Sequence, residues 1–376
     1  MSPRTTARRA QRGLTLIELM VAITIMLIVV AALLALFLNV SGSQREMERV
    51  NRQIETGRLS IFVLENEISH AGFWENYMPE FDDLTVSAAP ANVPTGTLPD
   101  PCLAYSAANW TETYKRQLLD LPVQVYDSVP ATCTDLLTHK KDDTDVLVVR
   151  HAETCLPGTP NCEADVAGAM YFQSSLCGTQ KPSSFDLSTG AFDQMFLKDC
   201  TTPSPKRKLV ADIYYVRDYA AAVGDGIPTL ARSRFDLVGG TLAQQPPTPL
   251  IEGVESFRVE LGLDTLSKTG AAVNYAQAIS WADPANKSTP SNRGDGSPDG
   301  AFVHCGATCT ADQLVNVVAV KLHVLARASA ISPGHNDTRS YQMGAVALGP
   351  FNDHYKRHAF ATTVRLTNVT GRRETP

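Results

Sequence analysis

Residues 13–40 read GLTLIELMVAITIMLIVVAALLALFLNV, and this stretch decides how the rest of the chain is organised. Its single ionisable side chain is Glu18, and Thr24 is the only polar residue of the run from Leu19 to Leu38. Because an α-helix rises about 1.5 Å per residue, this run forms a helix about 30 Å long, which is the thickness of the hydrocarbon core of a bilayer. The stretch therefore predicts a membrane-spanning helix.

The residues before this stretch are polar and basic. No acidic residue occurs before Glu18. The basic residues there are Arg4, Arg8, Arg9 and Arg12. Positively charged flanks stay on the cytoplasmic side of a membrane. We therefore expect the amino terminus in the cytoplasm and the remainder of the chain across the membrane.

Two simple interpretations of this segment compete with a more specific one. A cleaved secretory signal peptide has an apolar region of about 7 to 15 residues, and the present run is longer. A plain membrane anchor fits the length but leaves Glu18 unexplained, because a carboxylate near the start of a spanning segment costs about 2 to 3 kcal/mol. Glu18 therefore needs a partner.

The sequence Gly-Leu-Thr-Leu-Ile-Glu, from Gly13 to Glu18, resembles the class III signal of type IV prepilins. The resemblance lies in the short basic leader, the glycine, the hydrophobic residue after it and the glutamate five positions on. It implies cleavage between Gly13 and Leu14 by a membrane prepilin peptidase, and methylation of the new amino group of Leu14. In that family the glutamate meets the α-amine of a neighbouring subunit, and this pairing favours one axial register more than it adds net stability.

The composition is that of an ordinary folded protein with an acidic balance. Of 376 residues, 44% are hydrophobic and 19% are charged, so the chain can bury a sizeable core. The formal net charge of -6 would become -10 if residues 1–13 were removed with their four arginines. This balance argues against a DNA-binding face over the whole domain, and we expect no direct binding of nucleic acid.

Eight cysteines all follow the apolar stretch, which places them on the exported side, where an even number favours disulfides. Spacing does not fix how they pair. Short separation along the chain favours pairing Cys155 with Cys162 and Cys305 with Cys309. For the remaining four cysteines several pairings are open, and we choose Cys177 with Cys200 and Cys102 with Cys133.

The helix is expected to continue beyond Val40. Apolar residues recur at helical spacing among charged ones, at Met47, Val50, Ile54, Ile61, Leu64 and Ile68. One face then packs on a globular domain, and Gly72 is a reasonable stop. We therefore divide the chain into a leader (1–13), a membrane and assembly helix (14–40), an amphipathic continuation (41–72) and an exported β-rich domain (73–376).

Helical periodicity is weak after residue 72, and residues 73–144 are rich in loops. Enrichment in β-branched and aromatic residues predicts strands at 122–126, 145–151, 169–173, 209–217, 229–237, 254–263, 315–326 and 358–366. The predicted fold class is α+β and type IV pilin-like, with one long amino-terminal helix packed on a mostly antiparallel β-sheet domain. We expect the strand near Val254 to pair with those near Val317 and Phe360. Residues 283–300 form a polar loop that is expected to project or be mobile.

A second resemblance covers the carboxyl half. The segments VESFRVELG from Val254, VVAVKLHVLAR from Val317 and HAFATTVRLTN from His358 are similar to the PilW family of type IV pilus minor pilins. The size of the chain, far larger than a usual major pilin, agrees with that family. The related GspJ pseudopilins of type II secretion share the architecture and are the alternative.

The sequence shows no familiar catalytic motif. It has no Walker pattern, no G-x-S-x-G elbow and no H-E-x-x-H helix, so we predict no enzymatic activity and no cofactor. His304, Cys305 and Cys309 resemble a fragment of a zinc site, but a second pair of ligands is missing, which favours a disulfide or free thiols.

Two further sets of polar residues are candidate ligands. Asp295 and Asp299 resemble part of a calcium loop, yet the other oxygen ligands at the required spacing are missing, so a solvated turn fits better. His323 and His358 lie in strand-like runs, where structural histidines are commoner than ligands.

The two resemblances imply a non-catalytic minor pilin. It would join other minor pilins in an inner-membrane complex that starts pilus assembly and ends at the pilus tip. The implied partners are these minor pilins, the major pilin, prepilin peptidase and a tip adhesin. One alternative is a minor pseudopilin at the tip of the type II secretion pseudopilus. The other is a membrane-anchored exported enzyme, for which the sequence reveals no polar cluster.

Overall fold

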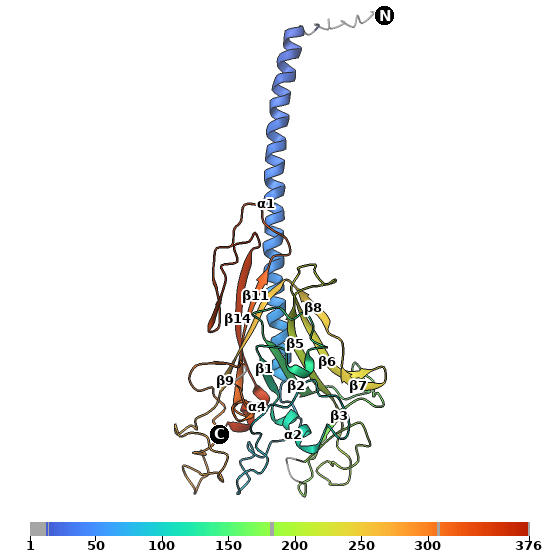
Figure 1. Cartoon of the computed structure of the whole chain (residues 1–376), viewed down its shortest axis with the longest axis vertical. Helices are drawn as coiled ribbons and strands as arrows, with labels where there is room; N and C mark the ends of the chain where they lie inside the picture. The colour runs from blue at the N-terminus through green and yellow to red at the C-terminus, as the bar shows by residue number, and fades with distance from the viewer. Residues whose placement is uncertain (1–12, 14, 181–183, 307–308, 375–376) are drawn as a thin grey trace, which may run out of the picture. The chain divides into compact units, whose positions relative to one another are not determined.

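A computed structural model describes residues 13, 15–180, 184–306 and 309–374 of the chain. The chain divides into two compact units, residues 1–51 and residues 52–376. Helix α1, Leu16–His70, supplies nearly all of the described part of the first unit and continues into the second (Figure 1). Its amino-terminal portion is long and apolar enough to cross a membrane, and the side chains there are exposed.

The globular unit contains an eight-stranded antiparallel sheet. Its main path has the order β1-β2-β5-β3-β4, and β6 pairs with β5, β7 and β8. The strands are β1 (Val123–Tyr126), β2 (Val146–Ala152), β3 (Tyr171–Ser174), β4 (Phe185–Ser188), β5 (Arg207–Arg217), β6 (Thr229–Val238), β7 (Thr241–Gln244) and β8 (Thr248–Glu252). Every residue of β2 is buried, which agrees with its nearly continuous apolar sequence VLVVRHA.

A second, four-stranded antiparallel sheet follows in the order β10-β9-β11-β14. Its strands are β9 (Val254–Leu263), β10 (Val303–His304), β11 (Val317–Arg327) and β14 (Arg357–Arg365). Val324 of β11 lies opposite Phe257 on one side and Phe360 on the other, so β11 separates the other two long strands. The expected pairing is therefore correct for β9 with β11, whereas β14 pairs with β11 and not with β9.

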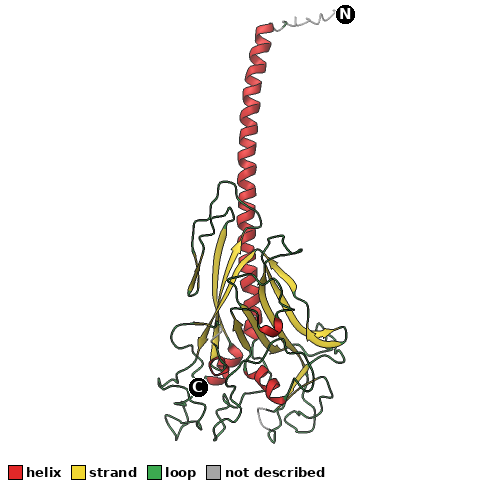
Figure 2. Cartoon of the chain, in the orientation of Figure 1, coloured by secondary structure: helices red, strands yellow, loops and turns green. Residues whose placement is uncertain are grey.

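The carboxyl-terminal part of α1 belongs to the core of the globular unit. Leu64 and Ile68 are fully buried in one cluster with residues of both sheets, among them Tyr214 and Phe257. Burying such a side chain contributes about 1.5 to 3 kcal/mol. The strands lie around this part of the helix in Figure 2. The predicted α+β class, a long helix with antiparallel sheets, is confirmed.

Helix α1 stops where the chain turns toward the large sheet. It ends at His70, and Gly72 adopts a φ of +74°, a conformation that glycine accepts without a steric penalty. The Gly72 amide donates to the carbonyl of Arg150 in β2. Gly72 thus ties the end of the helix to the sheet that it packs against.

Several short elements were not predicted from the sequence. They are α2 (Glu112–Asp120), a 3-10 turn (Ala131–Cys133), α3 (Ala311–Leu314), α4 (Thr367–Arg373), the short strands β4, β7, β8 and β10, and the hairpin of β12 (Tyr341–Met343) with β13 (Val346–Leu348). Helix α2 has a local start signal, because the Thr111 side chain accepts from the Tyr114 amide. It spans too few turns to show a period, and its end is held by tertiary contacts.

The polar loop at residues 283–300 departs from expectation in its second half. Asn292 and Arg293 are buried, and the Arg293 guanidinium donates to the carbonyls of Asn274 and Gln277 at 2.6 and 2.7 Å. This part of the loop therefore does not project. The buried arginine is satisfied by backbone carbonyls, and it joins two segments of irregular chain.

Candidate functional site

The amino-terminal motif places Glu18 in the first turn of α1. Its Oε2 accepts from the backbone amide and from the hydroxyl of Thr15, both at 2.9 Å, while the Glu18 amide donates to the Thr15 hydroxyl at 3.4 Å. This reciprocal pattern is a capping box, and it satisfies amides that the start of a helix leaves without partners. Gly13 is exposed, and Leu14, the other residue of the predicted cleavage site, lies outside the described residues.

Thr15, the local partner of Glu18, was not predicted from the sequence. The signal was present, because Thr-x-x-Glu before an apolar run is the sequence form of a capping box. Within the described residues, Thr15 is the sole donor to the Glu18 carboxylate, and Oε1 accepts from none of them. One carboxylate oxygen therefore remains available to a further donor.

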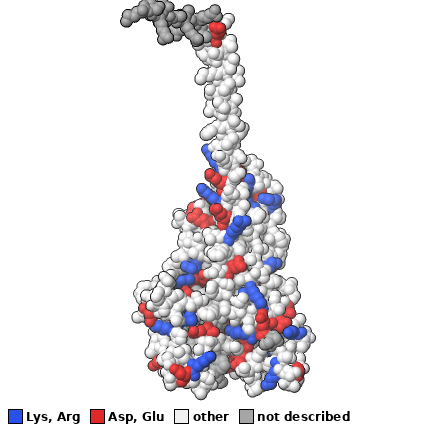
Figure 3. All heavy atoms as spheres, turned by 180° about the vertical axis from the view of Figure 1, so that it is seen from behind, with Lys and Arg blue, Asp and Glu red and all other residues white. Residues whose placement is uncertain are grey.

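The apolar stretch of α1 presents an uncovered surface. Between Leu19 and Leu38 the one polar side chain is Thr24, which donates to the carbonyls of Met20 and Val21 within the helix, so its hydroxyl is already satisfied there. The large apolar side chains from Leu16 to Val40 are exposed, and the helix beyond Glu18 is white over this stretch in Figure 3, without charged residues. An apolar surface of this extent marks contact with a membrane or with other proteins.

The structure forms four disulfides, and they are the four pairs named in the sequence analysis. They join Cys102 to Cys133, Cys155 to Cys162, Cys177 to Cys200, and Cys305 to Cys309. All four close loops of the globular unit, with sequence separations of 4 to 31 residues. Because Cys305 and Cys309 bond to each other, they offer no thiolates for the zinc fragment that was considered.

The His304 side chain is hydrogen-bonded to a carboxylate, that of Asp145. Both oxygens of the fully buried Asp145 lie 3.0 Å from its Nε2, and Arg258 donates to the same carboxylate at 3.0 Å. The hydrogen bond to Asp145 raises the pKa of His304. This cluster links the short strand β10 to the start of β2, and so connects the two sheets through charge.

The two calcium candidates act as anchors of turns. Asp299 Oδ2 accepts from the amides of Thr265 and Leu266 at 2.8 and 2.7 Å, and Asp295 Oδ1 accepts from the Ser297 amide at 2.9 Å. In the part of the chain that the structure describes, no three His, Cys, Asp or Glu residues are grouped to hold a metal ion.

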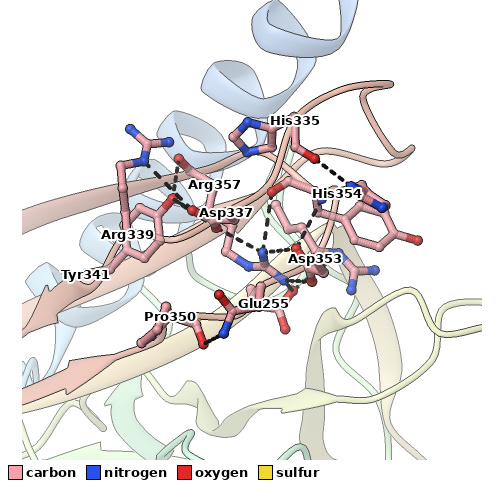
Figure 4. A network of polar contacts seen from close by, with 12 residues as sticks. Glu255, His335, Asp337, Arg339, Tyr341, Pro350, Asp353, His354 and Arg357 are labelled. Carbon is pink, nitrogen blue, oxygen red and sulfur yellow. Dashed lines mark hydrogen bonds and ion pairs between the residues drawn. The ribbon is translucent and has the colours of Figure 1, made fainter.

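A buried ionic network holds residues 328–356 against the four-stranded sheet (Figure 4). Arg357, at the start of β14, places Nη1 at 3.0 Å from Asp337 Oδ2 and both Nη atoms at 2.7 Å from the Asp353 carboxylate. Glu255 Oε2 lies 3.5 Å from Arg357 Nη2, and the Tyr341 hydroxyl donates to Asp337 at 2.9 Å. We call these five residues the Arg357 network.

The Arg357 network holds its side chains in one arrangement. The Arg357 side chain is 1% exposed and Asp337 is fully buried, so each charge depends on its partners. Burial and the hydrogen bond to Asp337 raise the pKa of Tyr341 to about 12. The guanidinium also lies 3.8 Å from the centroid of the Phe351 ring, so its apolar face is covered as well.

The β12–β13 hairpin has a second attachment. Glu260 in β9 accepts from the Ala345 amide at 2.9 Å and lies 3.1 Å from His323 Nε2 in β11. His323 therefore has a structural partner. His358 differs, because it is exposed and its ring contacts the Phe360 ring edge-on, at 4.7 Å between centroids. Among the described residues, neither histidine lies in a group of metal ligands.

An apolar helix that begins with a Gly-x-x-x-x-Glu signal and ends in the core of a disulfide-bonded β unit defines a type IV pilin-like protein. Comparison with known families agrees. Residues 8–34 match the prokaryotic N-terminal methylation motif. Residues 213–368, which include β9, β11 and β14, match the family of type IV pilus-assembly protein W. The chain is thus a pilus-related, type IV pilin-like protein, and both resemblances stated from the sequence are confirmed.

Other comparisons are more remote. The structure is similar to that of the type IV-like pilin TTHA1219 from Thermus thermophilus, with 13% sequence identity and a TM-score of 0.32. The likeness covers 84% of this chain and 96% of that one. No curated protein matches the chain by sequence.

Proposed function

We propose that this chain is a minor pilin that helps to initiate type IV pilus assembly and catalyses no reaction. The observation that carries the proposal is the amino-terminal segment, where a methylation motif at residues 8–34 includes the start of an uncovered apolar stretch, residues 16–40, whose single charge is Glu18. The match of residues 213–368 to type IV pilus-assembly protein W supports a role in the pilus rather than in type II secretion.

The proposed pathway begins in the inner membrane. The basic residues 1–12 stay in the cytoplasm, and the globular unit lies in the periplasm, where its disulfides form. Prepilin peptidase cleaves between Gly13 and Leu14 and methylates the amino group of Leu14. The protein then leaves the membrane as part of a short complex that becomes the tip of the pilus.

Within this complex, the apolar face of α1 drives lateral association and Glu18 sets the register. The α-amine of a neighbouring subunit approaches the Glu18 oxygen that Thr15 leaves free. In a low-dielectric setting an isolated carboxylate or ammonium is costly, so the pair forms at one axial position. The acidic globular unit supplies contacts to other minor pilins, to the major pilin and to a tip adhesin.

The direct test is the mature amino terminus, measured by mass spectrometry of protein from cells with and without prepilin peptidase. We expect a terminus at Leu14, carrying a methyl group, in the first strain and an intact leader in the second. An intact leader in both strains, or cleavage near Ser41, would overturn the proposal.

A deletion strain separates the pilus from the secretion pathway. Loss of the gene should abolish or strongly reduce surface pili while export through type II secretion continues. Normal piliation together with a secretion defect would instead assign the protein to the pseudopilus.

A further inference from the structure

A polar pocket of about 330 Å³ lies between α2 and the loop at residues 91–95. It lies at the end of the globular unit where α1 ends, since α2 is attached there by the Trp74 indole, which donates to the Leu119 carbonyl at 2.9 Å (Figure 1). The polar side chains that line the pocket are Asn92, Thr95, Glu112, Thr113, Arg116, Gln117 and Asp120. None of them takes part in the sites described above.

Asp120, the last residue of α2, forms the buried part of this lining. It is 5% exposed, and its Oδ1 accepts from the Tyr77 hydroxyl at 2.7 Å. Within the described residues, no group donates to Oδ2 and no salt bridge reaches Asp120. Burial raises its pKa to about 7 and the Asp82 carboxylate adds to this rise, although the Tyr77 hydrogen bond and the nearby Arg116 and Arg372 act in the other direction. Among the described residues, Asp120 Oδ2 therefore has no hydrogen-bond donor, and the two arginines act on the carboxylate only at a distance.

The walls of the pocket are held in place by contacts outside it. Glu80 accepts from the Ala91 amide and the Asn92 side chain, both at 3.2 Å. At the other end of the loop, the Gly96 amide donates to Asp312 at 3.1 Å. The pocket is thus formed before any ligand arrives, which lowers the entropic cost of binding.

The residues that line the pocket favour a cation attached to an aliphatic chain. A hydroxyl can donate to Asp120 but brings no positive charge, whereas an ammonium donates the hydrogen bond and also supplies the counter-charge that a buried carboxylate needs. Glu112 adds a second carboxylate to the lining, and Arg116 is turned toward the Phe185 ring, with its guanidinium 5.3 Å from the ring centroid. Val93 and Pro94 supply apolar wall.

We propose that this pocket binds a primary ammonium group at the end of an aliphatic chain. The ammonium donates to Asp120 Oδ2, and the stem lies along Val93 and Pro94. The group belongs either to a small free amine or to a lysine side chain of another protein. This inference is independent of the role in pilus assembly.

The test is calorimetric titration of the full-length protein in detergent micelles with n-butylammonium chloride. Butan-1-ol tests the need for charge, and sodium chloride tests for an effect of ionic strength. We expect saturable millimolar binding of the amine and none of the alcohol. Because the ammonium binds ionised Asp120, its affinity should rise between about pH 5.5 and about pH 8, with release of protons below about pH 7. Equal binding of the alcohol, or affinity independent of pH, would overturn the proposal.

Three variants place the binding event in the pocket. Asp120→Asn keeps an acceptor for Tyr77 but removes the charge, and we expect it to weaken binding at least about tenfold. Thr113→Trp adds bulk at an exposed position of the lining and should abolish binding without disturbing the fold. Asp83→Asn, a buried aspartate outside the pocket, should bind like the wild type. Wild-type affinity in Thr113→Trp would contradict the assignment even if Asp120→Asn failed to fold.

A final comparison identifies the source of the ammonium. Nα-acetyl-lysine N-methylamide carries the same butylammonium group on a peptide backbone. Tighter binding of this compound than of n-butylammonium indicates a lysine side chain of a partner, and equal or weaker binding indicates a free amine. Failure of both to bind would exclude the proposed site.

Discussion

The two compact units of this chain differ in where their apolar side chains lie and in how their charged side chains are paired. In the described part of the first unit, the apolar side chains from Leu16 to Val40 are exposed and Glu18 is held within its own helical turn. In the second unit most apolar side chains of both sheets are buried, and charged groups such as Arg357 and Asp337 are buried with them and paired over long sequence distances.

This difference indicates which part of the molecule is complete by itself. The globular unit buries most of its apolar groups and pairs most of its buried charges internally, so its stability depends on internal packing and ion pairs. The apolar helix satisfies its backbone and Thr24 but leaves its surface for a bilayer or for other helices. Substitutions in the first unit should therefore change association, whereas substitutions in the second should change folding. The following predictions test that division.

The largest effect is expected at Glu18. Glu18→Gln keeps an oxygen for the Thr15 amide and removes the charge that would meet a neighbouring amine. We expect normal processing at Gly13 but at least about a tenfold loss of the protein from sheared pili, because an ammonium in a low-dielectric core lacks its counter-ion. The measurement is immunoblotting of membrane and pilus fractions.

Thr24→Val is the matched control for Glu18→Gln. It also removes a polar side chain from the apolar helix, but Thr24 bonds only to carbonyls of its own helix, so assembly should be nearly unchanged. Thr15→Val tests the capping box separately and should cause a smaller loss than Glu18→Gln. Equal amounts of Glu18→Gln and wild-type protein in sheared pili would show that Glu18 does not set the register.

The next largest effect is expected at Arg357. Arg357→Leu leaves Asp337 buried without its main counter-charge, which costs about 3 to 5 kcal/mol of stability. Denaturant unfolding of the full chain measures this change, and proteolysis within residues 328–356 should become faster. Arg365→Leu, at the other end of β14, removes an exposed pair with Glu374 and should leave stability nearly unchanged. Similar effects of both substitutions would show that the Arg357 network contributes little.

Substitution of two glycines of α1, Gly42 in the first unit and Gly57 in the second, compares the two units directly. A Cβ at Gly57 would overlap the Phe360 ring of β14, whereas a Cβ at Gly42 would meet nothing within 4 Å. Gly57→Ala should therefore destabilise the globular unit by about 1 to 3 kcal/mol, and Gly42→Ala should cause no loss, because alanine favours the helix. Thermal unfolding measures both. In a Phe360→Ala background the cost of Gly57→Ala should shrink, and an unchanged cost would place the strain elsewhere.

The sequence predicted those features that repeat locally. The apolar run, the prepilin signal and the strands β2, β5, β9, β11 and β14 each carry several residues of one pattern, so single exceptions such as Arg150 in β2 did not hide them. The capping threonine at position 15 had a readable signal that was overlooked.

The features that depend on tertiary contact escaped prediction. Arg357, Asp337 and Glu255 carry no common motif, and their pairing follows from strand order and from the path of residues 328–356. Helix α2 is too short for a period, and the raised pKa of Asp120 arises from its burial at the end of that helix. The buried Arg293 lies in a stretch whose composition is that of a solvated loop, and composition does not report which member of a loop turns inward.

The smallest predicted effect concerns acid sensitivity of the Arg357 network. The hydrogen bonds from Arg357 lower the pKa of Asp353 below its ordinary value, so the ionised carboxylate favours the folded state. This contribution is complete above about pH 4, the ordinary pKa of an aspartate, and is lost as the pH falls through the lower folded-state pKa. Because the Asp353 side chain is 35% exposed, we expect less than about 1 kcal/mol.

Asp353→Asn isolates this contribution from that of the other carboxylates. The variant should be less stable than the wild type at about pH 7, and the difference in melting temperature should close as the pH falls toward about 3, because a protonated aspartate and an asparagine at this position both interact with Arg357 as neutral groups. Asp193→Asn, at an exposed aspartate that accepts from the adjacent Gln194 side chain, should show no such convergence. A constant difference between Asp353→Asn and wild type at every pH would mean that Asp353 holds residues 328–356 by its shape and hydrogen bonds, and that charge adds nothing at this position.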